Sequence, residues 1–246
     1  MRILFTNDDG YDSQGLHAVA DLFKDEHDIA VVAPDVQKSG FSHSLTLKPV
    51  SVAYREVSGY DYKVFAVGGT PVDCVKTARN VFFPKPDLVV SGINNGGNLG
   101  SDIMYSGTVS AAVDAAHSGI RAVALSYVDR HATASDFARC AEIFKRNFDK
   151  IISLEIPPKT MLNINFPIGE PKGIQTVRMN TQETFVDVYS EDDGKLIPSG
   201  HRDYSTLDKD TDEGYCLDGY ITITPLTTDK TDYSLLERIK RERFVL

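Results

Sequence analysis

The sequence predicts a doubly wound α/β domain followed by a β-rich extension and a terminal helix. Three observations lead to this fold class. Short apolar runs, of the kind that is buried on both faces of a parallel sheet, recur along the first part of the chain. Segments with apolar residues at helical spacing separate these runs, which is typical of βαβ units. The 246 residues, 41% of them hydrophobic, also suffice for a substantial core.

Strands and helices are predicted to alternate over residues 1 to about 165. The predicted strands are Met1–Phe5, Ile29–Ala33, Tyr62–Val67, Asp87–Val90, Ala122–Ser126 and Met161–Phe166. The predicted helices are Ser13–Lys24, Asp73–Phe82, Val109–His117 and Ala134–Leu154. Thr70 before Pro71 is a good helix start, and Gly119 is typical of a helix end. Ser44–Val50 and Val52–Val57 predict a hairpin or short extra strands.

The character of the chain changes after this point. The pattern predicts strand-like alternation over Gly173–Val188, an acidic, turn-rich and solvated loop over Ser190–Glu213, a strand at Gly219–Thr224 and an amphipathic helix at Tyr233–Arg243. Such an extension often reaches onto another subunit. The segment between Val90 and Val109 is predicted to be a long polar loop, which a compact domain rarely keeps as a mere connection.

Composition excludes several classes of protein. The formal net charge of −9 argues against broad binding to nucleic acid or to an anionic membrane. No apolar run approaches the ~18 residues that a membrane span needs. The three cysteines, Cys74, Cys140 and Cys216, are far apart and odd in number. They indicate reduced thiols, and we therefore expect a cytoplasmic protein.

Two adjacent carboxylates, Asp8 and Asp9, follow the first predicted strand. Placing two anions side by side at the end of a strand is electrostatically costly unless a cation neutralises them. A hard divalent cation with oxygen ligands would do so. The alternative interpretation is a turn or a helix N-cap, because Asn-Asp-Asp-Gly is also turn chemistry.

Polar side chains also follow two further strands, at the same edge of the predicted sheet as Asp8 and Asp9. Ser39 lies in the loop after the second strand, and Asn94 follows Asp87–Val90. Ligands of open α/β sheets bind beyond the carboxyl ends of the strands. Two carboxylates, an amide oxygen and a hydroxyl suit Mg²⁺, Mn²⁺ or Ca²⁺ far better than zinc.

An anion site is predicted near the same place. Ser106, Gly107 and Thr108 stand directly before a helix of small residues, where backbone N–H groups, two hydroxyls and the positive end of the helix dipole are available. The alternative interpretation is an ordinary N-cap. A metal ion beside an anion-binding helix start is what phosphoryl chemistry needs.

Five motifs in this order carry a family resemblance. The segments MRILFTNDDG, APDVQKSGFSHSLTL, GGTPVDCV, SGINNGGNLGSDIMYSGTVSAA and MLNINFP resemble the SurE family of stationary-phase survival proteins, which are metal-dependent 5′/3′-nucleotidases. The resemblance implies a phosphatase acting on nucleoside 5′- and 3′-monophosphates, with some reach to short polyphosphate. It also implies one divalent metal ion per subunit, Mg²⁺ or Mn²⁺, held by Asp8, Asp9, Ser39 and Asn94.

The same resemblance extends to substrate contacts and assembly. Asn98 matches a second family asparagine that resembles a phosphate contact, beside Ser106, Gly107 and Thr108. The fold that it implies is a Rossmann-like three-layer sandwich with a catalytic domain at 1–167. Residues 168–246 are implied to be a β-hairpin or similar extension with a C-terminal helix, through which a homodimer or homotetramer forms.

The roles of single residues stay open at this stage. Asp8 and Asp9 are the candidate catalytic residues, and Asp9 would orient or deprotonate a water molecule or attack phosphorus itself. His43 is a candidate general acid, although a surface or packing histidine is the more common case.

Three other functional classes are compatible with parts of this pattern. One is a receiver-like signalling module that binds Mg²⁺, and another is a haloacid-dehalogenase-like phosphatase with an aspartyl-phosphate intermediate. The first needs a phosphoacceptor aspartate where this chain has Asn94, and the second needs Asp-x-Asp where it has Asp8-Asp9-Gly10. The third is a nucleotide-binding protein without turnover.

Overall fold

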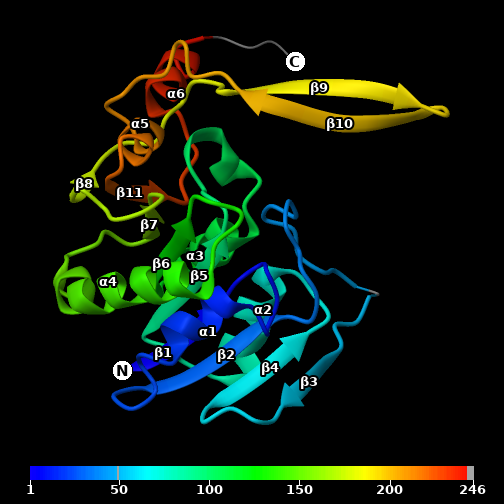
Figure 1. The fold of residues 1–246 in the computed structure, drawn as a ribbon, viewed down its shortest axis with the longest axis vertical. Helices are drawn as coiled ribbons and strands as arrows, with labels where there is room; N and C mark the ends of the chain where they lie inside the picture. Colours follow the sequence, from blue (N-terminus) through cyan, green and yellow to red (C-terminus); the bar gives the residue numbers. More distant parts are fainter. Residues whose placement is uncertain (49, 243–246) are drawn as a thin grey trace.

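A nine-stranded sheet runs through the computed structural model, which describes residues 1–48 and 50–242 (Figure 1). The strand order is β3-β4-β2-β1-β5-β6-β7-β11-β8. The bounds are β1 Arg2–Thr6, β2 Asp28–Pro34, β3 Tyr54–Val57, β4 Lys63–Val67, β5 Leu88–Asn95, β6 Arg121–Tyr127, β7 Thr160–Phe166, β8 Ile174–Thr176 and β11 Ile221–Thr227. From β4 to β7 every neighbouring pair is parallel, whereas β3 and β11 run antiparallel to β4 and β7. The predicted α/β fold with a mostly parallel sheet is confirmed.

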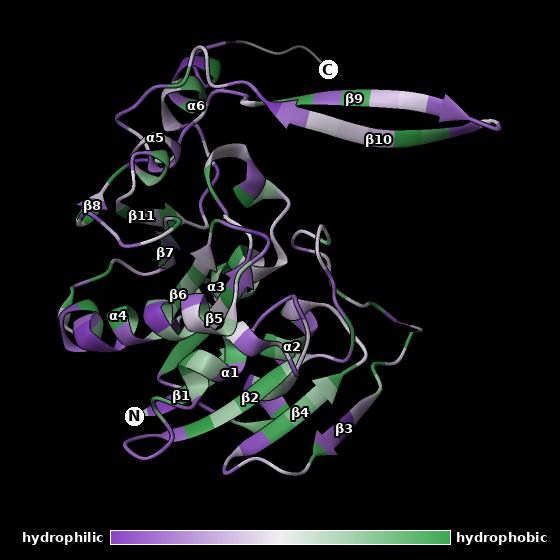
Figure 2. Cartoon of the chain, viewed as in Figure 1, coloured by the Kyte–Doolittle hydropathy of each residue, from purple (hydrophilic) through white to green (hydrophobic). Residues whose placement is uncertain are grey.

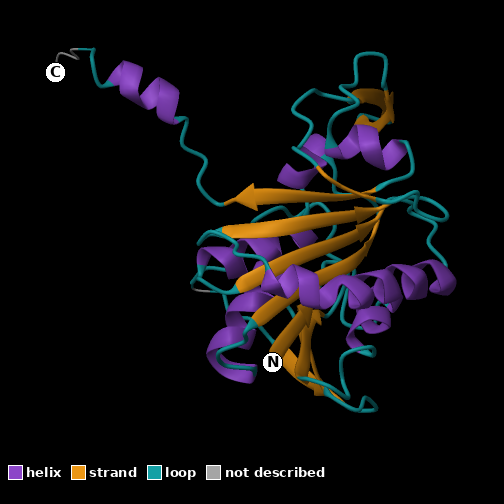
Figure 3. Cartoon of the chain, turned by 90° about the vertical axis from the view of Figure 1, so that its left-hand side faces the viewer, coloured by secondary structure: helices purple, strands orange, loops and turns teal. Residues whose placement is uncertain are grey.

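Helices cover both faces of this sheet, as Figure 3 shows. On one face, α1 (Gln14–Ala20) and α4 (Ala134–Ser153) share a core cluster with Ile3 and Phe5 of β1. On the other face, α2 (Pro71–Thr77) and α3 (Gly107–His117) share a second cluster with Leu4. Successive residues of β1 therefore point into different cores, which explains why this strand is an unbroken apolar run.

The helix ends predicted at Thr70 and Gly119 are confirmed, whereas α1 ends at Ala20 and α2 at Thr77, before the predicted Lys24 and Phe82. Thr70 and Asp73 form a reciprocal capping box at the start of α2, with Pro71 in the first turn. The Ser106 side chain accepts a hydrogen bond from the backbone N–H of Val109 at the start of α3. Gly119 follows α3 with φ +81°, a conformation that glycine adopts without strain.

Two predictions for the first half of the chain are wrong. Within Ser44–Val50 the described residues form no strand, and only Tyr54–Val57 adds to the sheet as β3. The polar loop predicted after Val90 begins later, because β5 continues to Asn95. Asn94 and Asn95 pair with β6 beyond an irregularity of the register, and this pairing overrides their preference for turns.

The prediction of a solvated loop over Ser190–Glu213 is also wrong. β9 (Phe185–Asp192) and β10 (Lys195–Arg202) form an antiparallel hairpin that projects from the body of the protein (Figure 1). Its turn residues, Asp193 and Gly194, both have positive φ, as the right-handed twist of a two-residue hairpin requires. Figure 2 shows that both strands mix polar and apolar residues, so the sequence lacks a clean strand signal here.

Two strands of the C-terminal region, β8 and β11, join the central sheet, and two helices accompany them. Of the strand predicted over Gly173–Val188, only β8 and the start of β9 form, while β11 agrees with the prediction. Helix α5 (Asp212–Leu217) is largely buried, whereas α6 (Tyr233–Ile239) buries none of its residues and reaches beyond the sheet in Figure 3. Arg243, the predicted end of the last helix, lies outside the described residues.

No helix among residues 1–48 and 50–242 is long and apolar enough to cross a membrane. An oligomerisation role for residues 168–246 stays a prediction.

Gly15 sets the distance between α1 and the sheet. A Cβ atom at this position would come within 2.1 Å of the carbonyl oxygen of Ile93 in β5. Helix α1 therefore lies directly on the strand that ends in Asn94 and Asn95. This contact leaves no room for a methyl group, because both partners are backbone.

We expect Gly15→Ala to lower the free energy of unfolding by about 1–3 kcal/mol through overpacking. Urea unfolding followed by circular dichroism measures this loss. Gln14→Ala, an exposed change in the same first turn, is the control and should shift stability by less than about 0.5 kcal/mol. Equal effects of the two changes would contradict the close-packing argument.

Candidate active site

The predicted polar residues meet where the order of the strands reverses. The chain proceeds from β1 to β2 on one side and returns to β5 on the other, so the edge between β1 and β5 is the switch point of the sheet. Asp8 and Asp9 follow β1, and Asn94 lies at the end of β5. Beyond these strands lies a cavity of about 420 Å³. Its lining includes Asp8, Gln37, Ser39, Asn94, Asn95, Gly97, Asn98, Asp102, Tyr105, Ser106 and Arg130.

Asp8 is held by the start of α3. It is 3% exposed, and its Oδ1 accepts a hydrogen bond of 2.5 Å from the Thr108 hydroxyl. A Cβ atom on Gly107 would approach the Cβ of Asp8 to 2.8 Å, so the absence of a side chain there lets the helix start close in. Burial raises the pKa of Asp8 to about 6, against the hydrogen bond from Thr108, which lowers it, and Asp9 adds a further rise.

Asp9 is held from the two neighbouring strands. Its Oδ2 accepts a hydrogen bond of 3.1 Å from the backbone N–H of Asn95, and its Oδ1 lies 3.4 Å from the Gln37 side-chain nitrogen. Gln37 also donates to the hydroxyl of Ser39 at 3.1 Å. Burial raises the pKa of Asp9, while these two hydrogen bonds lower it. Both carboxylates therefore carry an electrostatic cost that a nearby cation would relieve.

The donor set fits a hard divalent cation. The side-chain nitrogen of Asn94 donates to the carbonyl oxygen of Gly96 at 2.7 Å, which leaves the Asn94 Oδ1 as a free acceptor. Together with two carboxylates and the Ser39 hydroxyl, this gives oxygen atoms alone. Over residues 1–48 and 50–242, no group of three or more His, Cys, Asp and Glu side chains is arranged to hold a metal ion, as expected for a set with only two carboxylates.

Asn98 is fixed by two buried asparagines of β7. Its backbone N–H donates to the side-chain oxygen of Asn165, and its carbonyl oxygen accepts from the side chains of Asn163 and Asn165. The Asn98 side-chain nitrogen donates to the Ser126 hydroxyl at 2.8 Å. The loop after β5 is thus anchored to the neighbouring strands β6 and β7, and Asn98 faces the cavity.

The residues predicted to bind phosphate divide into two groups. Asn98 and Ser106 line the cavity, and their contact with phosphate stays a prediction. Thr108 is fully buried, and its hydroxyl donates a hydrogen bond to Asp8. Gly107 packs against the side chain of Asp8. In the structure the Thr108 hydroxyl binds the Asp8 carboxylate, and contact of Gly107 or Thr108 with phosphate also stays a prediction.

His43 lies apart from this cavity. Its Nε2 is 3.9 Å from the Asp114 carboxylate, which Lys76 approaches to 3.0 Å. It is not among the residues that line the cavity. His17 contacts the Tyr62 hydroxyl and the Tyr11 carbonyl oxygen through its two ring nitrogens, so it has a structural role.

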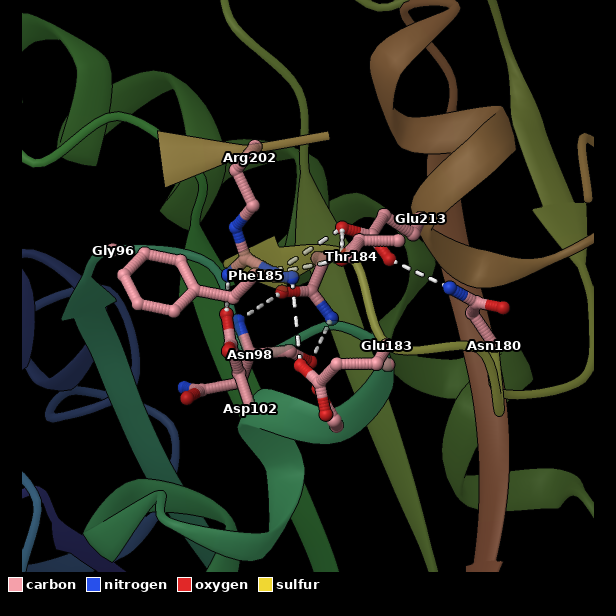
Figure 4. A network of polar contacts seen from close by, with 12 residues as sticks. Gly96, Asn98, Asp102, Asn180, Glu183, Thr184, Phe185, Arg202 and Glu213 are labelled. Carbon is pink, nitrogen blue, oxygen red and sulfur yellow. Dashed lines mark hydrogen bonds and ion pairs between the residues drawn. The ribbon is translucent and has the colours of Figure 1, made fainter. Parts of the chain in front are cut away.

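A polar network ties the loop after β5 to the C-terminal region (Figure 4). Arg202, at the base of the hairpin, pairs with Asp102 of this loop and approaches Glu213 of α5. The nearly buried Glu213 also accepts hydrogen bonds of 2.8 Å from Thr184 and Asn180. The network satisfies a carboxylate that would otherwise be costly to bury.

Asp212 anchors the same loop through backbone groups. Its carboxylate is fully buried and accepts hydrogen bonds from the N–H groups of Gly100, Asn180 and Glu213. Burial nevertheless raises the pKa of Asp212. The acidic stretch predicted to be solvated therefore ends in two carboxylates that belong to the interior.

Sequence reasoning missed several of these residues. Four of them line the cavity from loops or a short 3-10 helix (Gly100–Met104), where the sequence pattern does not indicate which way a side chain points: Gln37, Asp102, Tyr105 and Arg130. Asn163 and Asn165 could have been identified from the sequence. Two asparagines at alternating positions of a buried strand need hydrogen-bond partners on the same face of the sheet.

Comparisons with known proteins match almost the whole chain. The family model described as "Survival protein SurE" matches residues 3–186, which include every residue predicted for the site. A protein named 5′-nucleotidase SurE from Pelotomaculum thermopropionicum is 36% identical over 252 aligned residues, covering 98% of this chain and 95% of the relative. Another of this name from Thermoanaerobacter sp. is 38% identical, with 96% of each chain covered. The crystal structure of the SurE protein from Aquifex aeolicus has a TM-score of 0.86 and 34% identity over 98% of both chains.

The raised pKa of Asp8 predicts a pH-dependent stability of the metal-free protein. Asp8 titrates near 3.8 when unfolded and near 6 when folded, so between these values the folded state binds more protons and stability falls as the pH rises. We expect Asp8→Asn to remove this penalty, which amounts to about 3 kcal/mol at most.

Urea unfolding in EDTA at pH 4 and pH 8 measures the effect. Relative to the wild type, Asp8→Asn should gain stability at pH 8 and little at pH 4. Added Mg²⁺ or Mn²⁺ should stabilise only the wild type at pH 8. A difference between the two proteins that is the same at both pH values would contradict the expectation.

The role of Asp212 predicts a large cost of its removal. In Asp212→Asn the new amide nitrogen faces backbone N–H groups, and at least one of them loses its acceptor. We expect a loss of about 3 kcal/mol in the free energy of unfolding. Asp187→Asn on the exposed hairpin is the matched control. The idea fails if both substitutions shift the urea midpoint equally.

Proposed function

The chain belongs to the SurE family, and on this premise we propose that it is a metal-dependent 5′-nucleotidase that removes phosphate from nucleoside monophosphates. The observation that carries the proposal is that Asp8 and Asn94 line one cavity beside the start of α3, with Asp9 bound to the neighbouring Asn95. The relatives named 5′-nucleotidase SurE support the same activity. Neither a receiver module nor a haloacid-dehalogenase-like phosphatase is what the matched family describes.

The proposed cofactor is one Mg²⁺ or Mn²⁺ per subunit, held by Asp8, Asp9, Ser39 and Asn94. The support is the chemistry of their oxygen atoms and the cost of leaving Asp8 and Asp9 without a cation. When bound, such a cation neutralises charge on the substrate phosphate and polarises the phosphorus–oxygen bond. Neutralising both carboxylates also lets an anionic substrate approach this edge of the sheet.

The chain's own groups orient the reaction. Thr108 holds Asp8 in place through its hydroxyl, and the N–H of Asn95 holds Asp9. We assign the direct chemical role to Asp9, which either takes a proton from the attacking water or attacks phosphorus itself. Asn98 and Ser106 are the proposed phosphate contacts, because both line the cavity and are fixed from other strands or by capping.

The protein is further proposed to form a homo-oligomer in the cytoplasm. A homodimer or homotetramer formed through residues 168–246 is favoured by the exposed hairpin and by α6, which buries none of its residues. The three cysteines are free and buried, which suits a reducing compartment and favours a cytoplasmic location. Nucleic acid and membranes are not proposed as partners, because the net charge is −9.

Asp9→Asn should lower turnover of AMP at least about 100-fold while leaving the fold intact, because it removes the group that acts on the reacting atoms. The measurement is phosphate release from a panel of 5′- and 3′-monophosphates and short polyphosphate with Mg²⁺, Mn²⁺ and Ca²⁺. Asp25→Asn, an exposed aspartate in the turn after α1, is the control. Near-normal activity of Asp9→Asn would remove its assigned role, and a wild type inactive on the whole panel would defeat the nucleotidase proposal.

The same preparation separates the two roles of Asp9. Attack by the carboxylate leaves a covalent phosphoenzyme, whereas activation of water does not. Acid quenching during turnover of labelled substrate would trap the former.

A further inference from the structure

A second cavity adjoins the first one. It has a volume of about 610 Å³, within the range of roughly 300–1,000 Å³ that is typical of small-molecule sites. Gly97, Asp102 and Arg130 line both cavities, so the two share a wall. A molecule with its phosphate in the first cavity would extend past these three residues into the second space.

The second cavity is lined by apolar, aromatic and charged side chains, a combination that suits a flat heterocycle. Its apolar and aromatic side chains are Leu99, Val128, Ile168, Phe185, Tyr204 and Leu217. Its polar side chains include Asp129, Arg130 and His201. A nucleobase has apolar ring faces and a polar edge, and ligand sites of this kind combine an apolar wall with a few polar groups.

Phe185 forms a pre-arranged aromatic wall. Its ring lies over Gly200 of the paired strand, where a Cβ atom would approach the ring to 2.4 Å. The guanidinium of Arg202, its direct cross-strand partner, lies 5.4 Å from the ring centroid. Asp102 and Glu213 hold Arg202, so the cation that contacts the ring is itself restrained. Figure 4 shows Phe185 beside this network. A ring fixed in this way loses little entropy when a base stacks on it.

Arg130 stands at the boundary of the two cavities. Its side chain passes over Gly96, and it makes no ion pair with any carboxylate among residues 1–48 and 50–242. A cation at this point faces the region where the phosphate and the nucleoside of a substrate join. Its positive charge complements a substrate phosphate in the first cavity. A guanidinium group can also stack on the ring of a nucleobase in the second cavity.

We propose that the second cavity holds the nucleoside of the substrate, with the nucleobase stacked on Phe185 as the specificity-determining residue. The inference rests on the proposed function, whose reacting end it extends.

The test compares AMP with ribose 5-phosphate, which lacks the base. Phe185→Leu keeps an apolar side chain over Gly200 but removes the planar ring. The ratio of kcat/KM for AMP to that for ribose 5-phosphate should fall about tenfold in this variant. Phe185→Tyr should retain most of the ratio. Tyr189→Ala, which removes an exposed aromatic residue from the same strand, should not change it.

Binding gives a second readout that does not depend on turnover. Isothermal titration of adenosine into the metal-free protein should show binding, which Phe185→Leu weakens about tenfold and Tyr189→Ala leaves unchanged. Thermal unfolding checks that each variant is folded.

Each outcome decides a defined claim. A ratio and an adenosine affinity that Phe185→Leu leaves unchanged would overturn the nucleoside site, even if AMP is hydrolysed. A wild type that hydrolyses neither phosphate ester would overturn the proposed function, and the adenosine titration would still decide on the cavity.

Discussion

Two adjacent carboxylates directly after the first strand, Asp8 buried and Asp9 half-buried, make the strongest electrostatic demand on the surrounding elements. Asp8 and Asp9 are acceptable there only because other elements bring donors to them. The start of α3 supplies the Thr108 hydroxyl, and β5 supplies the N–H of Asn95. These contacts fix how α3 and β5 meet β1. The charge that they leave uncompensated is the electrostatic reason for proposing a cation here.

The second feature is the connection between the active-site loop and the C-terminal region. Asp212 holds the loop through the N–H of Gly100, and Arg202 holds it through Asp102. At the same time β8 and β11 extend the central sheet. The residues after 167 thus contribute to the same body as the switch point, and they form the aromatic wall next to it. Chemistry and substrate recognition can therefore be supplied by parts of the chain that are far apart.

The arrangement also reconciles an acidic protein with an anionic substrate. The net charge of −9 would repel a phosphate in general. The cavity counters this locally, with oxygen atoms arranged for a cation on one side and with Arg130 on the other. The start of α3 directs its positive end toward Asp8 and stabilises the pair of carboxylates.

Over residues 1 to about 165 the sequence predicts the alternation of strands and helices, and it places Asp8, Asp9, Ser39 and Asn94 after strands that end at one edge of the sheet. It could do so because apolar periodicity is local and because parallel strands end at the same edge. Tertiary structure decided the rest. The length of β5 depends on its pairing with β6, and the hydroxyl of Thr108 turns to Asp8. Asp212 becomes buried because Gly100, 112 residues earlier, offers it an N–H group. Such partners meet only in the folded chain, so no local pattern could have indicated them.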